Sequence, residues 1–174
     1  MSARDEVARR PVWILTDKSK CRIIQFMTSL HQARRLQQIG ASLFLLALIV
    51  GLFIPKFSVP RLGLSTHLLG VMQGIFLIAL GLLWPKLKLT PRLSLAAFSL
   101  AIFGFPAAWV SNLLAAFWGA GVTMLPLAAG GARGSELQET VIMIGLKSAA
   151  VTQIILLALI IWGLRGHAPG ESDQ

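Results

Sequence analysis

Among the polar side chains within, or at the edge of, the long apolar stretches of this 174-residue chain, five are the first candidates for chemistry. They are His67, Asn112, Glu139, Lys147 and Ser148. Glu139 and its neighbour Glu136 are the only carboxylates outside the terminal segments, so acid–base chemistry must fall to them or to His67. Polar groups inside an apolar span are costly unless they face protein or water, so each of the five marks a candidate site.

Each of these residues also has a purely structural interpretation. His67 is either an acid–base group or an interhelical hydrogen-bonding residue, and Asn112 is either a substrate contact or a similar interhelical bond. Lys147 can extend its ammonium group to the membrane surface, and Ser148 favours a hydrogen bond between helices. Glu139 stands in the first turn of a predicted helix, where the helix dipole favours a negative charge.

The composition indicates an integral membrane protein. Hydrophobic residues make up 55% of the chain and charged residues 13%, and the mean hydropathy is +0.72. The apolar residues form long blocks, and a helix of about 20 such residues crosses the hydrocarbon core of a bilayer. The net charge of +9 lies almost wholly outside these blocks. It therefore indicates contact with membrane lipid rather than with nucleic acid.

Residues 36–165 are predicted to form an all-α, four-helix transmembrane bundle. The four spans are expected at about 36–54, 64–84, 93–118 and 141–162. We interpret the first span as a plain lipid-facing helix, because it is uniformly aliphatic.

The N-terminal segment, residues 1–35, is basic. Its apolar residues from Ile23 to Leu30 recur at helical spacing. This pattern predicts either an amphipathic helix at the membrane interface or an ordinary positive flank of the first span. Residues 1–12 and the C-terminal tail, 166–174, are expected to be disordered.

Lysine and arginine counts predict the orientation. The N-terminal segment, the 85–92 loop and the tail together carry twelve, whereas the two loops on the other side carry three. The positive-inside rule therefore places both termini in the cytoplasm, with the chain in the inner membrane. Trp84, Trp118 and Trp162 end three of the spans, where we expect them to act as interfacial anchors.

Small residues share a helix face with several of the polar ones. Gly70 and Gly74 form a GxxxG pair on the stripe that carries His67, so this histidine should point toward another helix. Antiparallel threading brings the polar groups of the last three spans to a similar depth. We therefore predict a pocket between the second, third and fourth helices.

The loop from Gly119 to Thr140 is less polar than a plain linker. It is interpreted either as a cover over the polar groups or as a flexible connector. Ser135 and Gln138 have the spacing of a capping box that opens the fourth helix.

A family resemblance follows from the block Pro60–Gly74. Its sequence, Pro-Arg-Leu-Gly-Leu-Ser-Thr-His-Leu-Leu-Gly-Val-Met-Gln-Gly, resembles the hydroxylaminobenzene mutases, in which Pro-Arg-x-Gly-Leu-Ser-x-His precedes Gly-Val-x-x-Gly. The similarity covers about residues 32–165. Its further matches are Trp109, Asn112, Trp118–Gly121, Pro126, Gln138–Glu139 and Trp162–Arg165. The chain departs from the pattern at Leu69, where we expect a carboxylate, and at Gln73, where we expect asparagine.

The resemblance implies a cofactor-free isomerase in nitroarene degradation. It would convert an aryl hydroxylamine to a 2-aminophenol by moving the hydroxyl group from nitrogen to the ortho carbon. This chemistry needs a general acid at the departing oxygen, an aromatic face beside the cationic arene and exclusion of bulk water.

The resemblance also suggests roles for the polar residues. The predicted catalytic residues are His67, Glu139 and Asn112, with either His67 or Glu139 as the acid. The predicted substrate-binding residues are Trp109, Gln73, Trp118, Arg61 and Ser148. No metal site is expected, since the spans hold a single histidine.

Two further expectations concern function and assembly. Small multi-span bundles often associate symmetrically, so we expect a homo-oligomer. The rival hypothesis is a non-enzymatic membrane protein, such as an assembly factor or transporter subunit, whose polar residues serve only helix packing.

Overall fold

A computed structural model describes residues 17–165, with side chains from residue 25 onward. Four long helices dominate it: α2 (Asp17–Leu52), α3 (Pro60–Leu83), α4 (Pro91–Trp118) and α6 (Glu136–Leu164). The connectors contain the short helices η1 (Ile54–Lys56), η2 (Trp84–Lys86) and α5 (Pro126–Ala129). All four long helices are long and apolar enough to cross a membrane, which confirms the predicted fold class. The termini, for which disorder was predicted, lie outside the described residues.

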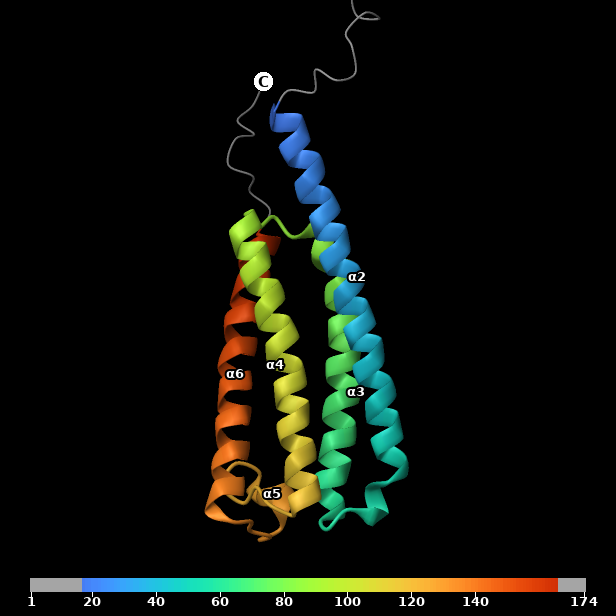
Figure 1. Ribbon diagram of the computed structural model, residues 1–174, viewed down its shortest axis with the longest axis vertical. Helices are drawn as coiled ribbons and strands as arrows, with labels where there is room; N and C mark the ends of the chain where they lie inside the picture. The colour runs from blue at the N-terminus through green and yellow to red at the C-terminus, as the bar shows by residue number, and fades with distance from the viewer. Residues whose placement is uncertain (1–16, 166–174) are drawn as a thin grey trace, which may run out of the picture.

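The four helices run antiparallel and lie in chain order (Figure 1). α2 packs on α3, α3 on α4, and α4 on α6. The start of α2 extends past the other helices, and the helix is continuous. Residues 19–35 therefore lead directly into the first span.

Local sequence signals explain where the helices begin and end. α3, α4 and α5 each begin at a proline, whose fixed φ suits the first helical position. Ser135 and Gln138 form the predicted capping box at the start of α6, with both reciprocal hydrogen bonds present. Gly119 ends α4 in the left-handed conformation with φ of 61°.

The first span is not a plain lipid-facing helix, so that prediction was wrong. A methyl group added at Gly40 would lie 2.8 Å from the backbone oxygen of Gly74, and one added at Gly74 would lie 2.8 Å from the oxygen of Gly40. A methyl group added at Gly81 would lie 2.8 Å from the backbone oxygen of Ala33. Backbone therefore contacts backbone along α2 and α3, as small residues permit between membrane helices.

Trp84 is a core residue rather than an interfacial anchor. Its indole nitrogen donates to Gln32 Oε1 at 3.0 Å, and Ser94 Oγ donates to the same oxygen at 2.9 Å. The Trp84 ring is only 2% exposed and packs edge-to-face on Phe98. A buried indole N–H needs a partner, and Gln32 supplies one from α2. Trp162, in contrast, is 70% exposed at the end of α6.

We expect Gly74→Ala to lower the stability of the protein. The added methyl group would meet the α2 backbone and Phe44 Cβ at 2.8–2.9 Å, and overpacking of this kind costs about 1–3 kcal/mol. Thermal unfolding in detergent, followed by circular dichroism, would show a lower midpoint. The control is Ala79→Val, an exposed position on the same helix. Equal midpoints for the two variants would contradict the proposed contact.

Candidate active site

A hydrogen-bonded cluster joins α3 to α4. Asn112 Nδ2 donates to Ser65 Oγ at 3.2 Å, and Trp109 Nε1 donates to the backbone oxygen of Thr66 at 3.2 Å. Thr66, Trp109 and Asn112 are all buried. The prediction that Trp109 and Asn112 share one side of their helix is confirmed.

The carbonyl oxygen of Asn112 has spare hydrogen-bonding capacity. Thr66 Oγ1 lies 3.4 Å from Asn112 Oδ1 but only 2.9 Å from the backbone oxygen of Leu62. A hydroxyl group has one proton, so it serves one of these acceptors at a time. The shorter distance favours Leu62, which leaves Asn112 Oδ1 able to accept from another donor.

Gly70 makes room for the Trp109 indole. A methyl group added at Gly70 would collide with Trp109 Nε1 and would lie 2.6 Å from Ala47 Cβ. The GxxxG pair therefore contacts two neighbouring helices: both glycines approach α2, and Gly70 also accommodates the indole from α4.

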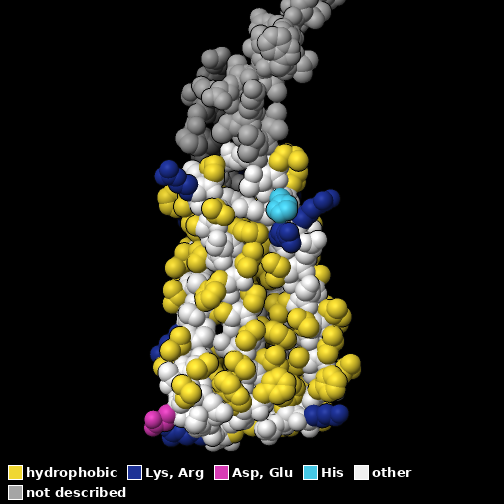
Figure 2. Space-filling view, viewed as in Figure 1, with side chains coloured by type: hydrophobic (Ala, Val, Ile, Leu, Met, Phe, Trp, Pro, Cys, Tyr) yellow, Lys and Arg dark blue, Asp and Glu magenta, His cyan; other side chains and the backbone are white. Residues whose placement is uncertain are grey.

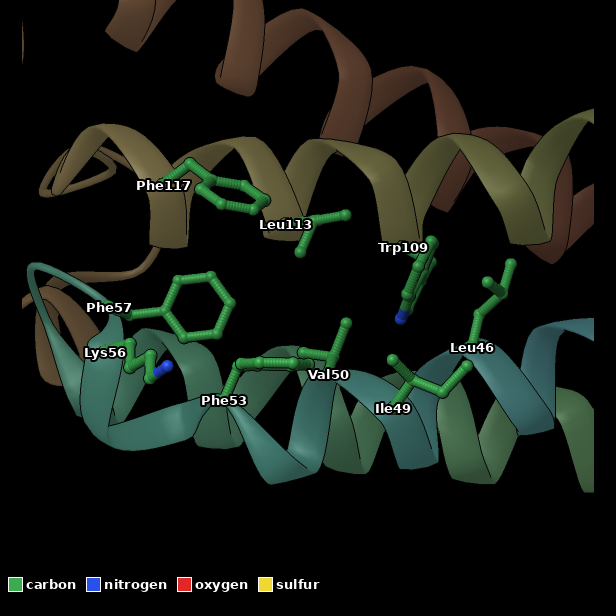
Figure 3. A pocket seen from close by; sticks show the side chains of 9 residues that line it. All are labelled: Leu46, Ile49, Val50, Phe53, Lys56, Phe57, Trp109, Leu113 and Phe117. Carbon is green, nitrogen blue, oxygen red and sulfur yellow. The ribbon is translucent and has the colours of Figure 1, made fainter.

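A largely apolar cavity of about 460 Å³ lies beside Trp109, between α2 and α4 (Figure 3). Its lining residues are Leu46, Ile49, Val50, Phe53, Lys56, Phe57, Trp109, Leu113 and Phe117. Phe57 and Phe117 make an edge-to-face contact at 5.1 Å, and Lys56 Nζ lies 5.5 Å from the centre of the Phe53 ring. The volume suits a single substituted benzene ring.

Most residues that line this cavity were not predicted from the sequence. Of the residues that line it, only Trp109 was a predicted site residue. The available signal was the pair Phe53 and Phe57, four residues apart around Pro55 at the end of the first span. It was overlooked because that span was treated as lipid-facing.

His67 faces α2. Its Nδ1 lies 2.8 Å from the backbone oxygen of Ala47, and a methyl group at Gly51 would lie 2.6 Å from the same nitrogen. A carbonyl only accepts, so Nδ1 donates its proton to Ala47, and Nε2 is the nitrogen that can exchange a proton with a ligand. The expectation that His67 points toward another helix is confirmed.

His67 and Asn112 do not meet in one pocket as predicted. Consecutive helical residues point about 100° apart. Thr66 turns toward Asn112 on α4, and His67 therefore turns away from it, toward α2.

Glu139 holds the loop that precedes α6. The carboxylate accepts hydrogen bonds from the backbone N–H groups of Gly121 at 2.8 Å, Gly134 at 3.1 Å and Thr123 at 3.3 Å. Ala129 of α5 is buried beside Leu62 at the start of α3. The loop is therefore a folded cover over this end of the bundle, and the flexible-connector interpretation is wrong.

The polar residues of α6 lie apart from the Asn112 cluster. Ser148 Oγ donates to the backbone oxygen of Gly145 within its own helix, and Lys147 is exposed. α6 packs on the side of α4 that carries Ser111. A methyl group added at Gly145 of α6 would collide with the Ser111 side chain. This placement contradicts the predicted pocket between the last three spans, because α4 separates α6 from α3.

The other predicted substrate contacts differ in environment. Arg61 and Trp118 are exposed at the ends of α3 and α4. Gln73 is buried, two turns from Thr66 on the same face of α3. Its Oε1 is the only fully buried side-chain nitrogen or oxygen without a hydrogen-bond partner among the described residues. Such a group is costly unless a ligand or water satisfies it.

Comparisons with known proteins add to this geometry. A family model described as styrene oxide isomerase matches residues 32–165. Hydroxylaminobenzene mutase HabB from Ectopseudomonas oleovorans is 50% identical over 141 residues, which cover 81% of this chain and 85% of the relative. Hydroxylaminobenzene mutase HabA from the same organism is 47% identical over 103 residues, 59% of this chain and 76% of the relative. No solved structure matches the chain.

Glu139→Gln should loosen the loop between Gly119 and Ser135. The substitution weakens three charge-assisted bonds, at a cost on the order of 1–3 kcal/mol. Hydrogen–deuterium exchange of the loop amides would become faster. Glu136→Gln, an exposed position in the same first turn, is the control. Unchanged exchange with lost activity would instead assign Glu139 to the chemistry.

Proposed function

The chain belongs to the styrene oxide isomerase family and is an isomerase of the mutase kind, and on that premise we propose that it converts an aryl hydroxylamine to a 2-aminophenol. The names of the two relatives support this substrate class. The reaction is an isomerisation: the N–O bond breaks and a C–O bond forms at the ortho carbon. After the C–O bond has formed, the oxygen releases the proton that was supplied to it. The ortho carbon loses its proton and the nitrogen gains one, so NH becomes NH2 and the atoms balance. The expected setting is nitroarene degradation.

The arene ring would bind in the cavity between α2 and α4. Trp109 is the observation that carries this proposal, because its ring lines the cavity while its N–H bonds to the cluster at Thr66. Aromatic faces stabilise a neighbouring cation, so Trp109 and the three phenylalanines suit a nitrenium-like arene. The apolar lining also keeps out water that would otherwise capture the ring.

Asn112 and Gln73 would orient the hydroxylamine group. Asn112 Oδ1 has spare capacity and Gln73 Oε1 has no partner. Both are acceptors, and an aryl hydroxylamine offers N–H and O–H donors. Binding would satisfy a buried oxygen that the protein alone leaves unpaired.

His67 is the better choice for the acid–base group. Both oxygens of Glu139 already accept backbone hydrogen bonds, whereas His67 Nε2 has no hydrogen-bond partner within the described part of the chain. His67 does not itself line the cavity. Ala47 lies between the two, since its carbonyl accepts from His67 and its methyl group lies beside Gly70, next to Trp109 of the cavity wall. Glu139 would then keep the cover closed.

The membrane placement is also a proposal. We expect the inner membrane with both termini cytoplasmic, on the twelve-to-three distribution of lysine and arginine. A homo-oligomer remains an expectation.

The direct test is turnover by the full-length protein. Purified in detergent without added cofactor, it should convert phenylhydroxylamine to 2-aminophenol, resolved by liquid chromatography. Metal content and the visible absorption spectrum of the same sample test the expectation that no cofactor takes part. Absence of turnover by folded protein would refute the proposed substrate.

Two substitutions at His67 distinguish proton transfer from positioning. His67→Asn retains a donor for Ala47 but cannot carry a proton at neutral pH, whereas His67→Ala loses both. If His67 is the acid, both variants should lose roughly 10²–10⁴-fold in kcat. Near-normal kcat in His67→Asn alone would show that the histidine only holds α2 in place. Circular dichroism checks the fold of each variant.

A further inference from the structure

We propose that a groove on the flank of α2 and α3 binds an anionic phospholipid through its headgroup phosphate. The groove has a volume of about 620 Å³ and lies where the first half of α2 passes the end of α3. The residues that carry the argument are Met27, Leu30, His31, Arg34, Gln37 and Leu82. None of them takes part in the proposed isomerisation, so the two proposals stand independently.

Among the described side chains, no carboxylate lies near the positive charge of the groove. Arg34 and His31 are exposed and lie one turn apart on α2. Among the residues whose side chains the structure describes, the carboxylates are Glu136 and Glu139, which both stand at the opposite end of the bundle. Figure 2 shows a histidine with lysine and arginine side chains gathered over α2 at this end, and acidic side chains only at the other end of the visible face. An anion is therefore the complementary ligand.

The apolar lining distinguishes a lipid from a free anion. Met27 is 61% exposed and Leu82 is 67% exposed on either side of the groove. Inorganic phosphate would make no use of these side chains. A glycerol backbone or acyl chain would cover Leu82 on the α3 side of the groove, as apolar burial favours.

The position of Arg34 along α2 suits contact with a lipid headgroup. Arg34 lies two residues before the apolar block of the first predicted span, so the expected membrane placement puts it near the level of the lipid phosphates. Met27, Leu30 and Arg34 recur at spacings of three and four, so they share one helix face. The backbones of Gly81 and Ala33 approach closely there. A methyl group added at Gly81 would lie 2.8 Å from the backbone oxygen of Ala33. The groove floor is therefore formed by these two small residues together with the side chain of Gln37, whose Cγ lies 2.6 Å from the same added methyl group.

Neighbouring arginines allow a matched experiment. Full-length protein and its Arg34→Gln and Arg35→Gln variants would be reconstituted in nanodiscs of phosphatidylcholine with a minor fraction of phosphatidylglycerol. Retained lipid would be measured by native mass spectrometry. Arg35 belongs to a different cavity, on the side of α2 that faces α4. We expect Arg34→Gln to retain about fivefold less phosphatidylglycerol than the wild type, and Arg35→Gln to match the wild type.

Three results would overturn the proposal. Equal losses in the two variants would indicate a general effect of positive charge. Equal retention of phosphatidylcholine and phosphatidylglycerol would exclude selection for an anion. Displacement of the lipid by inorganic phosphate alone would indicate a free-anion site. Turnover of phenylhydroxylamine in the same samples is a separate readout, so failure of the isomerase proposal would not affect this one.

Discussion

The backbone contact between α2 and α3 determines how the rest of the molecule is arranged. Glycines at positions 40, 74 and 81 bring the two helices together along most of their length. This contact places Ala47 against His67 and Gln32 against Trp84. It also sets α2 beside α4, so that Phe53 and Trp109 line one cavity. In a bilayer, where apolar side chains gain little by leaving lipid, such close packing is what holds helices together.

Much of the fold could be predicted because the sequence signals were local. Hydropathy located the four helices, and the Ser135–Gln138 capping box marked the start of α6. The partners of each helix could not be predicted in the same way. Lipid and neighbouring helices are equally apolar surroundings, so the composition of the first span did not reveal that it packs on α3. The same ambiguity hid the fact that α6 contacts α4 rather than α3.

Individual residues of the candidate site could be predicted from the sequence. Which of them lie together in the structure could not. The interpretation of Asn112 and Trp109 as neighbours followed correctly from their spacing on one helix. His67 was placed with them because its depth in the membrane matched and because its glycine stripe indicated that it faces another helix. Neither signal says which helix it faces. Trp84 shows the same limit, since its position at a span end suggested an anchor, while Gln32 on another helix makes it a core residue.

Glu139 and Gln73 are both buried polar residues, but hydrogen bonds within the protein account for only one of them. Glu139 is buried, yet three backbone N–H groups satisfy its carboxylate, so packing alone accounts for its presence. Gln73 is equally buried, and its oxygen has no partner. Native proteins keep few such groups, and a ligand or ordered water usually compensates the cost. The unpaired amide oxygen of Gln73 therefore points more strongly to ligand binding than the buried charge of Glu139 does. In the sequence alone, the charged residue is the more conspicuous of the two.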